Sequence, residues 1–153
     1  MAGDRGYTWD EVCAFHATLH FPKLSQQLSS QLATIEPSQD RDLRYYPCLV
    51  CLKDGTERDF VYLVEARSWL RHWGPMPWEL DRYRSNLLEV DDIQSIRGSP
   101  NRLPAGMANK VYAAGETGMG YTIFTVQFRD GSTTAFGTEF HIHDKGHHLG
   151  YSV

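Results

Sequence analysis

The sequence lacks the long apolar run of a membrane-spanning helix, and it contains little cysteine. No window approaches the roughly 18 apolar residues of a transmembrane segment, so we expect no membrane partner. Three cysteines, an odd number, provide no disulfide framework and favour free thiols in a reducing, cytoplasmic setting. The stretch from Met1 to Asp10 is polar and does not resemble a secretory signal.

A strong charge of one sign and a catalytic motif are also absent. The net charge of -4 argues against a protein that bulk electrostatics would hold on nucleic acid. The sequence has no G-x-S-x-G elbow, no H-E-x-x-H helix and no cysteine in a recognisable nucleophile context. We therefore predict no cofactor from motifs, and any hypothesis of an enzyme has to rest on other residues.

What remains is the composition of an ordinary globular protein. The chain has 153 residues, of which 41% are hydrophobic and 22% are charged, so neither disorder nor a fibrous repeat is indicated. This length suits one domain with a sizeable core. We predict a single domain over residues 1–153, with residues 1–7 and 145–153 loosely ordered because they are terminal.

The clearest local pattern is a strand near the C-terminus. Phe124, Val126 and Phe128 alternate with polar residues, which predicts a strand with one buried face. The Asp-Gly pair at 130–131 predicts a tight two-residue turn that places Phe128 opposite Thr133. Burial of the three apolar side chains would contribute about 1.5 to 3 kcal/mol each and make this face a folding anchor.

Other strands are predicted earlier in the chain. Residues 45–52 and 60–64 flank a second Asp-Gly pair, so we predict a second hairpin of the same kind. Pro47 suggests an edge strand or the start of a strand, because proline cannot donate a hydrogen bond to a neighbouring strand. Residues 110–114 predict a further strand, joined to the C-terminal hairpin by the glycine-rich residues 115–120.

Helical patterns precede the strands. Thr8 and Glu11 have the spacing of a capping box, and apolar residues at helical spacing follow from Trp9 to about His20. A four-residue ladder of leucines predicts a second helix between residues 22 and 35. The predicted class is α+β: two N-terminal helices packed on a mainly antiparallel sheet built from two Asp-Gly hairpins, with a small, partly open barrel as one possible form.

Two groups of cysteine and histidine could bind metal. Cys48 and Cys51 have C-x-x-C spacing, but on a strand they point to opposite faces about 10 Å apart, so we interpret them as structural thiols. Cys13, His16 and His20 share a helix face that also carries apolar residues, and we interpret that face as core. The glycine-rich residues 115–120 lead into a strand, whereas a phosphate loop leads into a helix.

The densest mixture of aromatic and cationic residues lies in the middle of the chain. Tryptophan and arginine are the residues that protein interfaces use as anchors, and nearby acids dilute the positive charge. This pattern favours a protein partner or a second copy over nucleic acid. The alternative is that the tryptophans fill the core under solvated arginines. The predicted binding residues are Trp69, Arg71, Trp73, Trp78, Arg82 and Tyr83.

Histidines cluster near the C-terminus. His141 and His143 would point the same way on a strand, and His147 could follow after a turn at Gly146. Imidazoles in this geometry could bind zinc or another divalent transition metal. The leading hypothesis is thus a non-catalytic binding domain with an aromatic and arginine surface. The alternative is a metal-dependent enzyme, hydrolase-like or cupin-like, built on these histidines.

The histidine hypothesis makes its own prediction. A built metal site would bind zinc, nickel or manganese well below micromolar concentration, because several imidazoles would converge on one ion. Substituting His141→Ala and His143→Ala together would abolish that binding. Calorimetry on the untagged protein measures both, and an affinity that is micromolar or weaker, or unchanged in the double variant, would reject the site.

Overall fold

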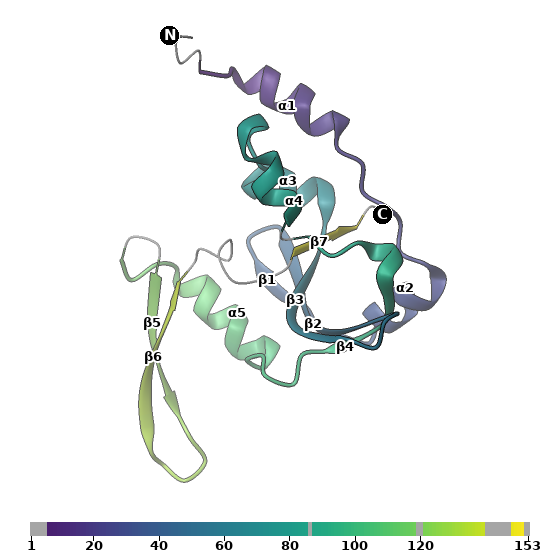
Figure 1. Cartoon of the computed structure of the whole chain (residues 1–153). Coiled ribbons are helices and arrows are strands. Elements are labelled where there is room, and N and C mark those ends of the chain that lie inside the picture. Colours follow the sequence, from purple (N-terminus) through teal and green to yellow (C-terminus); the bar gives the residue numbers. More distant parts are fainter. Residues whose placement is uncertain (1–5, 86, 119–120, 140–147, 152–153) are drawn as a thin grey trace.

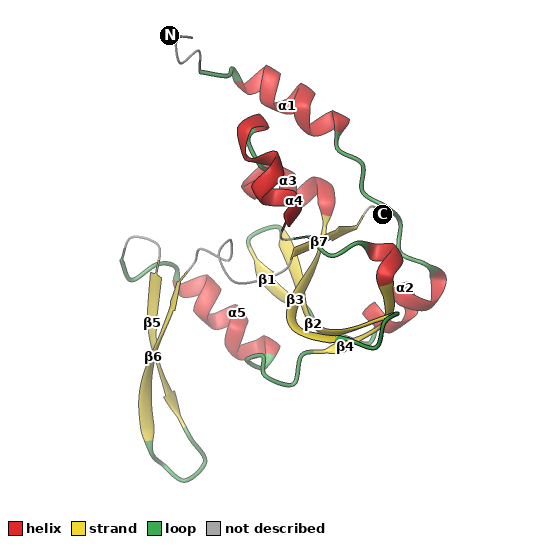
Figure 2. Ribbon diagram, in the orientation of Figure 1, coloured by secondary structure: helices red, strands yellow, loops and turns green. Residues whose placement is uncertain are grey.

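The computed structural model confirms the α+β class (Figures 1 and 2) and describes residues 6–85, 87–118, 121–139 and 148–151. In chain order its elements are α1 (Trp9–Thr18), α2 (Gln26–Leu32), β1 (Ser38–Asp40), β2 (Leu43–Leu52), β3 (Glu57–Glu65), α3 (Ala66–Trp73), the 3-10 helix η1 (Pro77–Glu79), α4 (Leu80–Ser85), the 3-10 helix η2 (Val90–Asp92), β4 (Ile93–Gly98), α5 (Ala105–Ala114), β5 (Tyr121–Gln127), β6 (Thr133–Glu139) and β7 (His148–Tyr151). No helix in these ranges combines the length and the apolar character needed to cross a membrane.

The main sheet is organised around β2 and β3. Its five strands run in the order β1-β2-β3-β7, and β4 is a further neighbour of β2. The long strand β2 pairs first with β1 and further along with β4, while β3 lies on its other side. All pairings are antiparallel except that of β3 with β7. No barrel closes among the described strands.

Pro47 lies inside β2, where the neighbouring strand changes from β1 to β4. The β1 pairing ends at Tyr45, and the β4 pairing begins at Cys48. The carbonyl oxygen of Pro47 accepts the Ser99 amide at 2.9 Å. Since the N and O of one strand residue point to the same side, the missing amide hydrogen of Pro47 faces this gap between two partners and leaves no unmade hydrogen bond.

The central hairpin is buried on both faces. On one face Cys48 and Val50 pack with the α2 leucines and with β4. On the other face Tyr45 packs with Val64 and with Trp69 of α3. This two-sided burial explains why the β2 sequence is nearly continuously apolar rather than strictly alternating.

The expected anchor is not the core. The β5–β6 hairpin forms a separate two-stranded sheet that extends away from the main sheet (Figure 1). Phe124 and Val126 are only half-buried, and Phe128 is 45% exposed. The prediction that all three side chains are buried is therefore wrong. Their alternation does place them on one face, but among the described residues that face meets the helix α5 and no second sheet.

The turn prediction is also corrected. The Phe128 carbonyl accepts the Gly131 amide at 3.0 Å, and the Phe128 amide donates to Ser132 at 2.8 Å. This is a three-residue loop with a glycine bulge, which pairs Phe128 with Ser132 instead of Thr133. The Asp130 carboxylate accepts the Ser132 amide at 2.9 Å and stabilises this loop over the tighter turn.

Residues 110–114, predicted as a strand, belong to the helix α5. Ala105 and Ala108 are buried at helical spacing, and the side chain of Asn109 accepts the Gln39 amide of β1 at 2.7 Å. The strand propensity of Val111 and its neighbours does not decide their structure, because the helix packs its small residues against β1.

The two N-terminal helices have different environments. In α2, Leu28 and Leu32 are buried against the sheet, as the leucine ladder predicts. In α1, Val12 is the one residue of the helix that is buried, and Figure 1 shows α1 standing apart from the sheet. The expectation that both helices cover the sheet therefore holds for α2 alone.

The backbone conformations of Gly55 in a turn and Gly106 in a helix predict opposite effects of an alanine substitution on the free energy of unfolding. Gly55 has φ +85° with no neighbour within 4 Å of an added Cβ, so Gly55→Ala should lower the free energy of unfolding by about 1 to 2 kcal/mol through backbone strain alone. Gly106 lies exposed in α5 with similar free space. Gly106→Ala should raise the free energy of unfolding by about 0.5 kcal/mol. Denaturant unfolding measures both, and equal effects would contradict the loop assignment.

Candidate functional site

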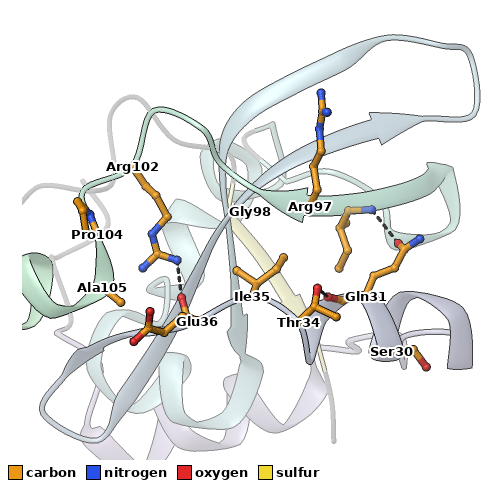
Figure 3. Close-up of a pocket in the computed structure, with 11 residues that line it drawn as sticks. Ser30, Gln31, Thr34, Ile35, Glu36, Arg97, Gly98, Arg102, Pro104 and Ala105 are labelled. Atoms are coloured by element: carbon orange, nitrogen blue, oxygen red, sulfur yellow. Dashed lines mark hydrogen bonds between the residues drawn. The ribbon is translucent and has the colours of Figure 1, made fainter.

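One concavity lies between α2, β4 and the start of α5. Its volume is about 490 Å³, and Figure 3 shows Arg102 and Gln31 among its lining residues. Arg102 donates to the carbonyl of Glu36 and to Ser38 Oγ, and Gln31 accepts the Ile96 amide at 2.9 Å. These polar groups already hold the surrounding segments together, so this concavity does not offer them to a ligand.

A second cleft lies between α1 and α3. Its volume is about 570 Å³. Its apolar floor includes Leu19, Phe21 and Leu70, while Arg67 and Arg71 of α3 supply positive charge. An apolar floor with a few charged groups is the usual composition of a binding site. We take this cleft as the candidate functional site.

α1 is held beside α3 by a small number of contacts. Within α1 itself, the predicted capping box is present: the Thr8 amide donates to the Glu11 carboxylate at 2.8 Å, and the Glu11 amide donates to the Thr8 hydroxyl at 3.3 Å. The contact between α1 and the segment after α3 is made by His16, whose Nε2 lies 2.9 Å from the Pro75 carbonyl oxygen. Gly74 permits this approach, because an added Cβ would lie 2.4 Å from the His16 ring.

α3 presents arginines because its other face is in the core. Glu65 at the end of β3 caps the helix by accepting the amides of Arg67 and Ser68 at 2.9 and 2.7 Å. Desolvation raises the pKa of Glu65, but the hydrogen bonds outweigh it and the net pKa is lowered. With Trp69 directed into the core, Arg67 and Arg71 are exposed on the opposite face.

An acid moderates the charge at one end of α3. Asp42 Oδ1 lies 2.7 Å from His72 Nε2, and Asp42 Oδ2 lies 3.8 Å from Arg71 Nη2. Some desolvation raises the pKa of Asp42, but its own backbone amide and His72 outweigh this effect, so the net pKa lies below its ordinary value. Asp42 therefore stays ionised at neutral pH and orients α3 toward the turn after β1.

One exposed aromatic ring lines the cleft, and a second one contacts the segment that leads into α1. Trp9 lines it and is 63% exposed, and Trp78 on η1 is 64% exposed. The Tyr7 ring lies 5.2 Å from that of Trp78 between centroids, which links the start of α1 to η1. Large aromatic rings left in water beside arginines are typical of interaction surfaces.

The predicted binding residues separate into three groups. Trp69 is 3% exposed and belongs to the core, so its side chain lines no surface. Arg71 lines the cleft, whereas Trp78 is exposed but does not line it, and its ring contacts Tyr7. The side chains of Trp73, Arg82 and Tyr83 lie outside the described part of the structure, and their role stays a prediction.

Sequence reasoning missed Tyr7 and Trp9. Helical spacing assigned Trp9 to a buried face, whereas the structure leaves it exposed at the first position of α1. The available signal was the pair of acids that follows it, Asp10 and Glu11, which is typical of a solvated first helical turn.

The cysteines and histidines do not form a metal site in the described residues. Cys48 is fully buried and Cys51 half-buried on β2, and both are free, as predicted. Cys13, His16 and His20 all line the cleft and are not core residues, which corrects the earlier interpretation. Across the described ranges no three His, Cys, Asp or Glu side chains could hold one ion. His141, His143 and His147 lie outside those ranges.

Comparison with known proteins does not assign the cleft. No protein-family model, no curated protein and no solved structure matches the chain. The function must therefore be argued from the residues that line the cleft and from their exposure.

The exposed thiol of Cys13 and the buried thiol of Cys48 should differ sharply in reactivity. Burial raises the pKa of the Cys48 thiol to about 12, so it stays protonated and inaccessible, whereas Cys13 is exposed in the cleft. Because the thiolate is the reactive form, a disulfide reagent at about pH 8 should modify Cys13 in the native protein and Cys48 only after unfolding. Mass spectrometry of the labelled peptides checks the order. Rapid native labelling of Cys48 would contradict the buried β2–β3 core.

Proposed function

We propose that the protein is a non-catalytic binding domain that recognises a protein partner through the α1–α3 cleft. The exposure of Trp9 in the same cleft as Arg67 and Arg71 is the observation that carries this proposal, and the exposed Trp78 lies against Tyr7 at the start of α1. Tryptophan and arginine together are the residue types most enriched at the energetic centres of protein interfaces.

The charges of the cleft favour an acidic partner segment. Arg67 and Arg71 can form charge-assisted hydrogen bonds with carboxylates, and the apolar floor can accept one aliphatic or aromatic anchor. A second copy fits this cleft poorly, because a symmetric contact would bring like arginines together. A nucleic acid would meet the ionised Asp42 and Glu65 nearby and the overall charge of -4.

The weak attachment of α1 suits a binding role. Val12 is its buried residue, and the contact of His16 with Pro75 is a single hydrogen bond. An element held by few contacts can adjust its position when a ligand enters, at small cost in stability. The cleft would then close on a peptide through a shift of α1 over α3.

A defined peptide pair tests the proposal. We expect a peptide with one Phe anchor flanked by glutamates to bind with a micromolar dissociation constant, and its lysine counterpart to bind at least about tenfold more weakly. Quenching or shift of tryptophan fluorescence reports binding, because Trp9 and Trp78 are exposed. Binding should also slow the labelling of Cys13.

Matched variants localise the effect. Arg67→Glu with Arg71→Glu, and separately Trp9→Ala, should each weaken binding of the acidic peptide by about tenfold or more, because all three residues line the cleft. Arg129→Glu changes the same kind of charge at the tip of the β5–β6 hairpin and should have no effect. Equal binding of the two peptides, or equal loss in the Arg129 variant, would count against the cleft.

A further inference from the structure

The α1–α3 cleft is lined by basic side chains from both of its walls. Arg67 and Arg71 line it from α3, and His16 and His20 line it from α1 and the residues that follow α1. Among the described lining residues there is no aspartate or glutamate, and Glu65 uses both carboxylate oxygens to accept amides of the first turn of α3. The whole chain has a net charge of -4, so the cleft differs in sign from the molecule around it. A concavity lined by charge of one sign concentrates ligands of the opposite sign, and this cleft is therefore suited to an anion.

A third concavity shows that this composition is not general. It is a groove of about 330 Å³ between α5 and β5, at the opposite end of the molecule from α1 (Figure 1). Leu103, Met107 and Phe124 contribute to a mainly apolar lining, and Lys110 is the one charged residue among those described. The group of basic residues without acids is therefore a property of the α1–α3 cleft.

Arg67 and Arg71 lie on the same side of α3. They are four residues apart, a spacing that places helix side chains next to each other, with about 5 to 6 Å between Cβ atoms. Each guanidinium presents a planar fork of donors that matches two oxygens of one anion. A carboxylate has two oxygens and one charge, which a single fork satisfies, whereas a phosphoryl group has three terminal oxygens and about two negative charges near pH 7. Two adjacent forks therefore match a phosphoryl group better than a carboxylate.

Both guanidinium groups are available to a ligand. In the described part of the chain, the side chain of Arg67 makes no hydrogen bond and belongs to no ion pair. Arg71 Nη2 donates to Ser68 Oγ at 3.2 Å and lies 3.8 Å from Asp42 Oδ2. That ion pair is long and exposed to solvent, so it holds Arg71 weakly. The Asp42 carboxylate has its closer contact with His72, at 2.7 Å.

The cleft also has room for the residues beside a phosphoryl group. Its volume is about 570 Å³, and Leu19, Phe21 and Leu70 belong to its apolar floor. Trp9, which is well exposed, lines the same cleft. A free phosphate ion would contact the arginines and leave this apolar surface in water, whereas a peptide would cover it with a neighbouring side chain. The lining therefore favours a phosphorylated peptide over inorganic phosphate.

We propose that the segment recognised by the α1–α3 cleft is phosphorylated, with its phosphoryl group between Arg67 and Arg71 and an adjacent apolar side chain against Trp9. This inference rests on the proposed function, because it uses the same cleft and narrows the acidic partner to a phosphopeptide. Removal of the phosphate from such a partner removes the charge that the two arginines bind. The cleft would thus distinguish the phosphorylated from the unphosphorylated form of its partner.

Three peptides of one sequence test the ligand. Each carries one Phe anchor, and a residue beside it is phosphoserine, glutamate or serine. Fluorescence anisotropy of the labelled peptides with the full chain measures the dissociation constants. The phosphoserine peptide should bind at least about tenfold more tightly than the glutamate peptide, and the serine peptide should bind most weakly. Equal or tighter binding of the glutamate peptide would overturn this inference and leave the proposed function intact, whereas no binding of any of the three would overturn both.

Matched variants show whether the guanidinium forks cause the preference. Arg67→Lys with Arg71→Lys keeps both charges at exposed positions but removes the forks, so the preference for phosphoserine over glutamate should fall to about threefold or less. Arg129→Lys, at the tip of the β5–β6 hairpin, makes the same change elsewhere and should leave the preference as it is in the wild type. A preference that survives the double substitution, or that is lost equally in the Arg129 variant, would contradict the assignment to these arginines.

Inorganic phosphate distinguishes the peptide from the free ion. It should displace the phosphoserine peptide only at concentrations about a hundredfold or more above the dissociation constant of the peptide, because it lacks the apolar contacts. Displacement at a concentration close to that dissociation constant would show that the cleft binds phosphate alone and would overturn the phosphopeptide proposal.

Discussion

The structure depends on the burial of one strand pair, β2 and β3, on both faces. Cys48, Val50, Val61 and Leu63 are fully inaccessible to solvent and form one face. The opposite face of the same pair needs its own cover, because an exposed apolar sheet face is costly. α2 covers the first face, and α3, which follows β3 directly, covers the second through Trp69.

This constraint positions the candidate site. Since Trp69 must fill the core, the opposite face of α3 has to carry the polar residues, and Arg67 and Arg71 are directed to the surface. α1 adds little to either core and is held mainly by His16 and by the Tyr7–Trp78 contact. The cleft therefore forms between an element that is packed into the core and one that is held by few contacts.

The two apolar and aromatic surfaces lie at opposite ends of the chain and differ in charge. The α1–α3 cleft carries Arg67 and Arg71, whereas the groove beside the hairpin is mainly apolar, with Lys110 as the one charged residue among those described.

The sequence alone determined three features: the capping box of Thr8 and Glu11, the leucine face of α2, and the α+β class with an antiparallel sheet. Each depends on residues that lie close together in the chain. The alternation of Phe124, Val126 and Phe128 was also local, and these residues do share a face. Tertiary structure alone decided what covers that face, that residues 110–114 are helical in α5 and that Trp9 is exposed while Trp69 is buried. Periodicity states which side chains lie together, but burial depends on which distant element reaches them, and that is set by the packing of the whole chain.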